Sequence, residues 1–534
     1  MKRILFINPF NVGMSDYMKT KHNKEDVAIR YGILSIASYI KENLKEDIEI
    51  KIIDYTTKEF EGYTYEKHFQ HLKKIIFEYK PDFIGLSAMF NFLLEIIMEM
   101  ANSCKSIDEK ILVFAGGPCA MAYAEKMLKN ANIDAICFFE GEIPILELCK
   151  SKDAFFEIEK GMSWLTLDKL NKGYQPQPLM IEDLDEIPTL KFNLLEGLEQ
   201  YMNVNNIYNL KGITFKSLPI HTSRGCPFNC IFCASHFVHG KKMRMMSAER
   251  VISDVRHMVE KYGITHLEIC DDQFLINIER AKKILSGLAE FNLEVSVPSG
   301  VSAFIIDEEI ARLMKSAGMN TISLAIESGC EYTIKNIIDK PINLNKISQI
   351  LEHLKNNDMK VHAFVVLGFP GELDSHRKES IEFLKKSSFD WFSVVCATPL
   401  KGSRLYDICL ENKYIEEKYE SKDGFYKSAI TTEDFTAEEI SEIVYYTNLE
   451  LNFVNNYNLR VGNYEEAFEY FNYVAIKFPF HAFAHYYIAK ALEGMGKVTE
   501  LVNKEYEKFF EIIKSNKEWK KYAEDFNLIE KGLF

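Results

Sequence analysis

The feature that most constrains the fold is a repeated alternation of short apolar strands with helical stretches, which starts at the N-terminus and again near residue 219. In the first block, five segments have the apolar character of strands: Arg3–Asn8, Ile48–Ile53, Phe83–Ala88, Ile111–Ala115 and Asp134–Phe138. Strands that alternate with helices form parallel sheets. Residues 1–150 are therefore predicted to form a five-stranded parallel α/β sheet of the Rossmann-like type.

The second block, residues 219–430, repeats the rhythm about six times. Its predicted strands lie near Ile220–Ser223, Thr265–Cys270, Glu294–Pro298, Thr321–Glu327, Val361–Leu367 and Phe392–Ala397. One helix is clear, because Ser247 can cap it and Gly263 can end it, while Val251, Val255, Val259 and Tyr262 share a face. Parallel strands joined by such helices can curl into a barrel.

The remaining parts have other patterns. Residues 151–218 are less regular, and we interpret them as a connector. Residues 431–534 lose the strand pattern and become helical, with Gly462 and Gly496 34 residues apart. Five residues there fit the register of a tetratricopeptide repeat: Gly462, Tyr464, Ala467, Phe471 and Pro479. At most one and a half repeats are present, so we predict a helical C-terminal domain rather than a peptide-binding array.

Composition excludes several classes of protein. The net charge of −14 is spread along the chain and offers no basic surface to a phosphate backbone, so nucleic acid is not expected as a partner. No uncharged apolar run of 18 residues is present, which predicts a cytoplasmic protein without a membrane span. The 11 cysteines are odd in number and include one tight group, which favours reduced thiols over disulfides.

That group lies directly after a predicted strand. Cys226, Cys230 and Cys233 have C-x3-C-x2-C spacing. Thiolates are the preferred ligands of iron–sulfur clusters, and three of them leave the fourth iron of a four-iron cluster open to a small molecule. An open iron indicates catalysis, so the three cysteines are our candidate metal ligands and catalytic residues.

Two other interpretations of the cysteines are weighed. Buried free cysteines are common in cores, but three within eight residues, beside Gly225 and Pro227 in a loop, disfavour that explanation. A zinc knuckle needs a fourth ligand, which His236 or His239 could supply, so spacing alone leaves zinc open.

The motif resembles the C-x3-C-x-aromatic-C signature of the radical S-adenosylmethionine (SAM) superfamily, with Phe232 as the aromatic residue. The resemblance implies a partial (βα)6 barrel. It also implies a [4Fe–4S] cluster whose open iron is chelated by the amino and carboxylate groups of SAM, with Phe232 near the adenine.

Three later strand-end segments resemble parts of that superfamily that contact SAM: Ile269–Phe274, Ile322–Gly329 and Gly368–Glu372. The residues expected to contact SAM are Asp272, Gln273, Glu327, Ser328 and Gly368. Asp271 is a further candidate, although surface capping explains any one of Asp271, Asp272 and Gln273 equally well. An ordinary tight turn is the alternative for Gly368.

The first block lacks a nucleotide fingerprint, because the turn Asn8–Gly13 contains no G-x-G-x-x-G to receive a pyrophosphate. Small residues instead follow the later strands, at Gly85–Met89, Ala115–Pro118 and Phe139–Glu142. Ligands of open α/β sheets bind at the carboxyl ends of the strands. A degenerate sheet that only supports the barrel is the alternative.

This arrangement resembles a cobalamin-binding domain, in which a serine segment precedes a Gly-Gly pair; here 26 residues separate Met89 from Gly116. The resemblance predicts that these residues contact cobalamin: Ser87, Gly116, Gly117, Glu140 and Gly141. The family's D-x-H-x-x-G is absent, and its nearest match, Asp374-Ser-His376, lacks the glycine. Cobalt would therefore have no histidine of that kind, and its lower axial ligand is left open.

The domain order over residues 1–410 resembles the cobalamin-dependent radical SAM enzymes, of the methylase and anaerobic Mg-protoporphyrin ester cyclase type. The methylase form implies that a 5′-deoxyadenosyl radical activates an unactivated substrate carbon, which then receives a methyl group by way of cobalamin. The implied partners are a small-molecule or peptide substrate and a one-electron reductant of the flavodoxin or ferredoxin type.

Other functions are also consistent with the sequence. A radical cyclase or rearrangement enzyme would not transfer methyl, and a sensor would bind both cofactors and use the helical tail to engage a partner. A tRNA methylthiotransferase is disfavoured by the acidic charge. Candidate substrate-facing residues are Trp391, Arg404 and Tyr406, and the substrate itself is not identified.

Overall fold

The computed structural model describes residues 1–10, 27–204, 215–416, 419 and 425–530. The chain forms two compact units. The first unit comprises Met1–Val204, Phe215–Leu293 and Pro399–Gly424, and the second comprises Asn205–Thr214, Glu294–Thr398 and Phe425–Phe534. Within the described ranges, no helix combines the length and apolar character needed to cross a bilayer. The part of the predicted turn from Asn11 to Gly13 lies outside the described residues.

The first unit begins with a six-stranded sheet in the order β2-β1-β3-β4-β5-β6. Its strands are β1 (Lys2–Asn8), β2 (Ile48–Asp54), β3 (Phe83–Ser87), β4 (Leu112–Gly116), β5 (Ala135–Cys137) and β6 (Trp164–Leu165). The five predicted strands are confirmed and pair in parallel. The sixth, antiparallel to β5, comes from the predicted connector. Trp164 is buried there with its ring edge-on to Phe114 at 5.4 Å, so burial of an indole favours this short strand.

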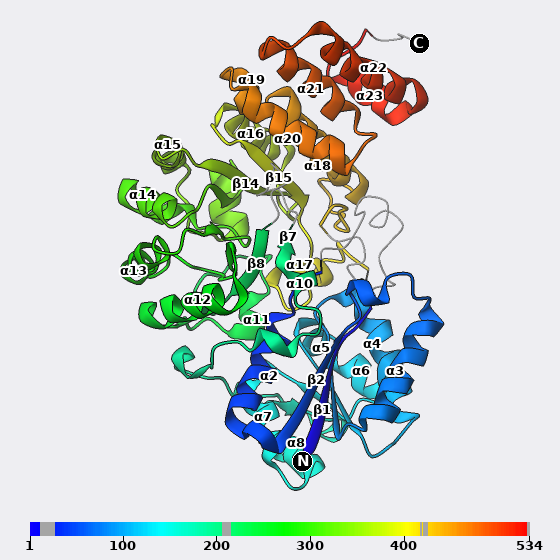
Figure 1. The fold of residues 1–534 in the computed structure, drawn as a ribbon. Coiled ribbons are helices and arrows are strands. Elements are labelled where there is room, and N and C mark those ends of the chain that lie inside the picture. The colour runs from blue at the N-terminus through cyan, green and yellow to red at the C-terminus, as the bar shows by residue number, and fades with distance from the viewer. Residues whose placement is uncertain (11–26, 205–214, 417–418, 420–424, 531–534) are drawn as a thin grey trace. The chain divides into compact units, whose positions relative to one another are not determined.

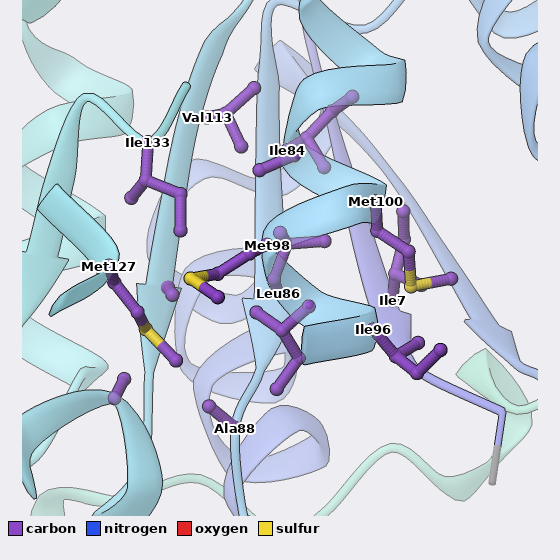
Figure 2. Close-up of a cluster of buried hydrophobic side chains, with 14 of the residues drawn as sticks. Ile7, Ile84, Leu86, Ala88, Ile96, Met98, Met100, Val113, Met127 and Ile133 are labelled. Carbon is purple, nitrogen blue, oxygen red and sulfur yellow. The ribbon is translucent and has the colours of Figure 1, made fainter. Parts of the chain in front are cut away.

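Helices cover both faces of this sheet (Figure 1), with α2 (Tyr31–Leu44) and α7 (Glu142–Lys150) on one side and α3 (Tyr65–Tyr79) and α4 (Leu94–Lys105) on the other. Figure 2 shows Ile84 and Leu86 of β3 packed near Met98 and Met100 of α4. Strands that are buried on both faces become continuous apolar runs in the sequence, which is why they were predictable. The shorter helices are α5 (Pro118–Ala122), α6 (Ala124–Asn130), α8 (Ala154–Lys160) and α9 (Leu167–Asn171).

The rest of the first unit contains the start of the second βα block. Strand β8 (Phe215–Ile220) pairs in parallel with β11 (His266–Ile269), and β7 (Asn203–Val204) pairs antiparallel with β8. We predicted the first of these strands near Ile220–Ser223, which is too late in the sequence. Pro219 lies inside β8. Among the described residues, β7 pairs with Phe215 and Lys216 and does not reach Pro219, and a strand edge without a pairing partner tolerates proline.

A two-stranded hairpin, β9 (Ser223–Arg224) with β10 (Arg244–Met245), follows β8. The helices are α10 (Glu199–Met202), α11 (Ser235–His239), α12 (Ala248–Tyr262), α13 (Ile278–Leu288) and α17 (Arg404–Glu411). Helix α12 has the predicted caps, because Ser247 accepts a hydrogen bond from the Arg250 amide and Gly263 has φ of +62°. Its buried face differs slightly, since Met258 is buried in place of Val259.

The second unit continues the block and ends in helices. Its strands are β12 (Glu294–Ser296), β13 (Thr321–Glu327), β14 (Lys360–Leu367) and β15 (Trp391–Cys396). The last three form a parallel sheet in that order. The covering helices are α14 (Glu308–Ser316), α15 (Ile347–Asn356) and α16 (Asp374–Lys386).

The C-terminal region is helical, as predicted. Its helices are α18 (Ala437–Leu449), α19 (Tyr457–Arg460), α20 (Tyr464–Lys477), α21 (Ala482–Gly494), α22 (Thr499–Ser515) and α23 (Lys517–Asp525). Helices α20 and α21 form a helix-turn-helix in which Ala467 and Phe471 are fully buried. Gly494 lies against Tyr464, and a Cβ there would be 2.4 Å from the tyrosine ring.

Two asparagines join this helical region to the edge of the sheet. The Asn452 amide donates to the Phe392 carbonyl at 2.9 Å and accepts from the Phe392 N–H at 2.7 Å. Asn448 makes the same pair of bonds with Val394, at 2.8 and 3.3 Å. Trp391 stacks on Tyr470 at 5.2 Å. Trp391 is therefore a buried packing residue, which corrects its prediction as a substrate-facing side chain.

Candidate functional site

The cysteine loop, residues 225–243, connects the two strands of the β9–β10 hairpin. Gly225 begins it with φ of +90°, and a Cβ at this position would lie 2.4 Å from the carbonyl oxygen of Lys242. The two ends of the loop therefore meet so closely that only glycine fits.

The three thiols lie within this loop, with Cys226 buried and Cys230 and Cys233 half-buried. A turn brings the Cys233 amide to the Cys230 carbonyl at 3.1 Å. The Ser235 amide points at the Cys233 sulfur at 3.5 Å, a contact that favours the thiolate. Three soft donors on one short loop fit an iron–sulfur cluster.

Within the described ranges, no three His, Cys, Asp or Glu side chains converge as they would around one metal ion. A four-iron cluster does not require such convergence, because each thiolate binds a different iron. Phe232, the predicted adenine neighbour, is half-buried on the same loop.

The ends of β8 and β11 are joined by Asp271. Its two carboxylate oxygens accept hydrogen bonds from the Thr222 amide and hydroxyl, both at 2.5 Å, and from the Ser223 hydroxyl at 2.7 Å. Asp271 is fully buried, so its role is to join strands rather than to bind SAM. Asp272 accepts from the Ser235 hydroxyl at the start of α11, and Gln273 is half-buried beside it. Their contact with SAM remains a prediction.

The sheet of the first unit brings three predicted cobalamin residues together. Ser87 and Gly116 are register partners at the carboxyl ends of β3 and β4. Gly117 follows with φ of +106°, and a Cβ there would lie 2.8 Å from the Ala88 carbonyl oxygen. That carbonyl accepts from the Cys119 amide at 2.9 Å. At this edge the side chains are small and the backbone segments after β3 and β4 pack closely together. Such an edge fits the approach of a large flat ligand.

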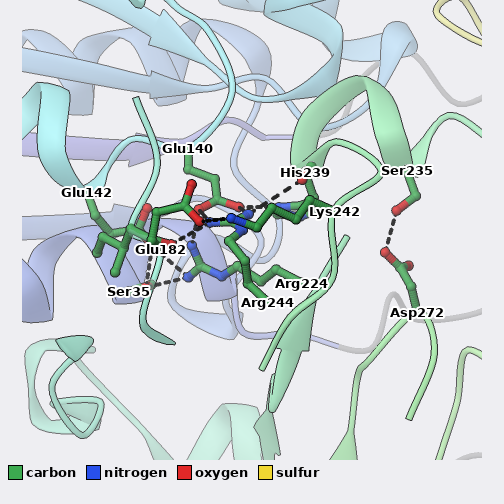
Figure 3. Close-up of polar contacts among 11 residues, drawn as sticks. Ser35, Glu140, Glu142, Glu182, Arg224, Ser235, His239, Lys242, Arg244 and Asp272 are labelled. Atoms are coloured by element: carbon green, nitrogen blue, oxygen red, sulfur yellow. Dashed lines mark hydrogen bonds and ion pairs between the residues drawn. The ribbon is translucent and has the colours of Figure 1, made fainter. Parts of the chain in front are cut away.

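Glu140 and Gly141 have different surroundings from those we predicted. A Cβ on Gly141 would lie 2.6 Å from Ile36 of α2, so this glycine is needed for packing. Glu140 is buried and lies between Arg224, Arg244 and His239 (Figure 3). The contact of both residues with cobalamin therefore remains a prediction, and the described contacts of Glu140 are all to the cysteine loop and its hairpin.

The ion-pair cluster around Glu140 was missed in the sequence. Arg224 also binds Glu142 at 2.7 Å, and the Ser35 hydroxyl donates to Glu142 at 2.6 Å. Burial alone raises the pKa of Glu140, but hydrogen bonds from His239 and Arg244 hold that pKa well below its usual value. The one local signal was an arginine directly before the Gly-Cys pair.

In the second unit, Glu327 ends β13 with φ of +63°, and the β13–β14 register shifts between Ala325 and Glu327. Such a conformation is costly for a residue with a side chain and is typical of functional positions. Lys340, which we did not predict, donates to the Glu327 carboxylate at 2.6 Å and to the Ala325 carbonyl at 2.8 Å. Both side chains of the pair are buried.

Ser328 and Gly368 have structural contacts of their own. The Ser328 hydroxyl lies 3.3 Å from that of Ser380 and accepts from the Cys330 amide. A Cβ on Gly368 would lie 2.5 Å from Ile440 of α18. Packing and turn formation account for both residues, and their contact with SAM remains a prediction.

Replacing Lys340 with methionine is expected to destabilise the second unit by about 3–5 kcal/mol, because Glu327 would become a buried unpaired charge. Trp391 and Trp519 lie in this unit, so denaturant unfolding followed by tryptophan fluorescence measures the change. Lys335→Met is the matched control, since the Lys335–Glu331 pair is exposed and contributes little. Equal stability of the two variants would contradict this assignment.

Two of the candidate substrate-facing residues lie near the cysteine loop. The Leu405 amide donates to the Ile231 carbonyl at 2.7 Å, which places the start of α17 against the loop. Arg404 is exposed and Tyr406 is buried. A substrate contact by either residue remains a prediction.

Comparison with known proteins identifies two segments of the chain. Residues 26–149 match the model of the B12 binding domain, and residues 220–384 match that of the Radical SAM superfamily. An uncharacterized methyltransferase of Pyrococcus horikoshii is 29% identical over 76% of this chain and 85% of its own length. The cytidylyl-2-hydroxyethylphosphonate methyltransferase of Streptomyces wedmorensis is 24% identical over 84% of this chain and 90% of its own.

A solved structure has the same fold. The radical SAM methyltransferase TsrM of Kitasatospora setae, solved with cobalamin and a [4Fe–4S] cluster, matches with a TM-score of 0.58 and 14% identity. The match covers 78% of this chain and 76% of that one. With a B12 binding domain and a Radical SAM domain in one chain, the protein belongs to the cobalamin-dependent radical SAM enzymes.

Proposed function

We propose that this enzyme methylates an unactivated carbon of its substrate. When bound, the cluster supplies the electron that cleaves SAM to methionine and a 5′-deoxyadenosyl radical, and cobalamin supplies the methyl-carrying cobalt. Cys226, Cys230 and Cys233 would hold the cluster and leave one iron for SAM. The edge formed by Ser87, Gly116 and Gly117 would receive the cobalamin.

The observation that supports this proposal most is that the residues of both candidate sites belong to one compact unit. The cysteine loop and the Ser87–Gly116 edge both belong to the first unit. Relatives that match along most of the chain are named as methyltransferases, which favours methyl transfer over cyclisation or rearrangement.

The chain's own residues would prepare the site for radical chemistry. The Ser235 amide points at the Cys233 sulfur and favours its thiolate form. Glu327, Asp272 and Gln273 are proposed to bind polar groups of SAM. A one-electron donor of the flavodoxin or ferredoxin type is proposed as the partner protein, and a small molecule or peptide as the substrate. The 11 free cysteines support a reducing compartment such as the cytoplasm.

The test uses full-length protein, purified without oxygen and reconstituted with iron, sulfide and cobalamin. SAM with a deuterated methyl group and a strong reductant are added, and products are followed by mass spectrometry. We expect 5′-deoxyadenosine together with S-adenosylhomocysteine, and transfer of the deuterated methyl group to added candidate substrates.

The other functions predict different products. A cyclase or rearrangement enzyme would form 5′-deoxyadenosine without S-adenosylhomocysteine and would leave no deuterium in its product. A sensor would bind both cofactors and form neither nucleoside product. Either result would overturn the proposal of methyl transfer.

A further inference from the structure

Glu140 contacts three residues, one directly before the cysteine loop, one within it and one directly after it. Its carboxylate accepts from Arg224, which precedes Gly225, at 2.8 Å. It accepts from Arg244, which follows the loop, at 2.5 and 2.9 Å. It also lies 2.8 Å from the Nδ1 of His239, which ends the helix inside the loop. Glu140 lies in the segment that follows strand β5. Its single carboxylate therefore joins both ends of the cysteine loop, which lies about 100 residues later in the sequence.

The hairpin that closes the loop places two positive charges opposite each other. Arg224 and Arg244 are direct partners across the antiparallel β9–β10 pair. Both arginines are more than nine-tenths buried. Like charges placed directly opposite each other destabilise a strand pair, and burial increases the repulsion. Glu140 lies between them and forms hydrogen bonds with both (Figure 3).

Glu142, the second carboxylate of this group of ion pairs, contacts only one of the two arginines among the described contacts. Glu142 binds Arg224 and Ser35 but makes no described contact with Arg244 or His239. It therefore holds one end of the hairpin and leaves the other end to Glu140. This difference provides a matched pair of acids, two residues apart in one segment, for an experiment.

We propose that Glu140 is a positioning residue for the iron–sulfur cluster, a carboxylate from the cobalamin-binding domain that closes the cysteine loop. The inference rests on the proposed function in one respect, the binding of the cluster by Cys226, Cys230 and Cys233. It assigns Glu140 to the cluster rather than to cobalamin. Assembly of a stable cluster by the cysteine loop then depends on a residue of the cobalamin-binding domain.

The test compares Glu140→Gln with Glu142→Gln in the full chain, reconstituted with cluster and cobalamin. The readouts are loss of iron to a chelator, the electron paramagnetic resonance spectrum of the reduced cluster with and without SAM, and bound cobalamin by absorbance. Loss of a residue that orients metal ligands weakens metal binding by roughly 10–100-fold. We expect Glu140→Gln to release iron faster by about that factor and to alter the spectrum.

Cobalamin content should stay unchanged in Glu140→Gln, and Glu142→Gln should show the smaller effect on iron release. Wild-type iron release and spectrum in Glu140→Gln would overturn the proposal. An intact cluster with lost cobalamin would also overturn it, because that result assigns Glu140 to cobalamin. None of these readouts requires a substrate or methyl transfer, so failure of the proposed function would be seen separately.

A second variant separates positioning from general misfolding. Glu140→Gln with Arg244→Met removes one of the two facing arginines together with the shared anion, and leaves Arg224 paired with Glu142. This double variant should regain part of the iron retention lost in Glu140→Gln. Unchanged iron loss in a folded double variant would contradict the role of Glu140 in offsetting the arginine charges.

Discussion

Replacing Cys230 with alanine is expected to abolish formation of 5′-deoxyadenosine from SAM. With two thiolates left, the loop cannot hold a four-iron cluster that keeps one iron open for SAM. Reconstituted protein should then fall from about four iron atoms per chain to a small fraction of that. Iron analysis and mass spectrometry of the nucleoside product measure both effects.

Cys270→Ala is the matched control for this experiment. Cys270 is half-buried like Cys230 and belongs to the same unit, but burial raises the pKa of its thiol, which disfavours the thiolate that metals bind. Its loss should leave iron content and SAM cleavage near wild type. SAM cleavage that survives in Cys230→Ala, or that disappears in Cys270→Ala, would contradict our assignment of the ligands.

Replacing Gly117 with alanine is expected to remove most of the bound cobalamin while the cluster stays. The new Cβ would lie 2.8 Å from the Ala88 carbonyl oxygen, at a φ of +106° that alanine rarely adopts. The backbone must therefore shift where β3 and β4 end, at the edge proposed to receive cobalamin. We expect at least a tenfold weaker affinity, which corresponds to about 1.4 kcal/mol, measured by cobalamin absorbance after gel filtration.

Gly62→Ala controls for the strain of a positive φ in the same domain. Gly62 has φ of +80°, and an added Cβ would meet nothing within 4 Å. This variant should lose some stability and keep its cobalamin. Wild-type cobalamin binding by Gly117→Ala would show that the cofactor binds elsewhere.

The sequence was most informative where structure depends on neighbouring residues. The predicted bounds of β13 and α12 match the observed ones, because an apolar strand and a capped amphipathic helix are both local patterns. The three cysteines were found for the same reason, since they lie within eight residues. Strand β6, only two residues long, has no pattern of its own and forms because Trp164 is buried.

Long-range charge pairs could not be predicted in this way. Glu140 and Arg244 are 104 residues apart, and Glu327 pairs with a lysine from a turn that no motif marks. We assigned Glu140 to cobalamin because strand-end residues of such sheets contact ligands. In the structure, all described partners of its carboxylate lie in the hairpin and in the loop between its strands, and contact with cobalamin remains a prediction.

The hydrogen bonds that two asparagines make to β15 have a consequence for aggregation. Asn448 and Asn452 occupy backbone groups that would otherwise be free along the outer strand of the β13–β14–β15 sheet. An outer strand with free backbone groups is a template for pairing with another chain and for aggregation. The C-terminal helices thus protect this edge strand from pairing with another chain. We expect variants that lack these helices to form inclusion bodies rather than smaller active proteins.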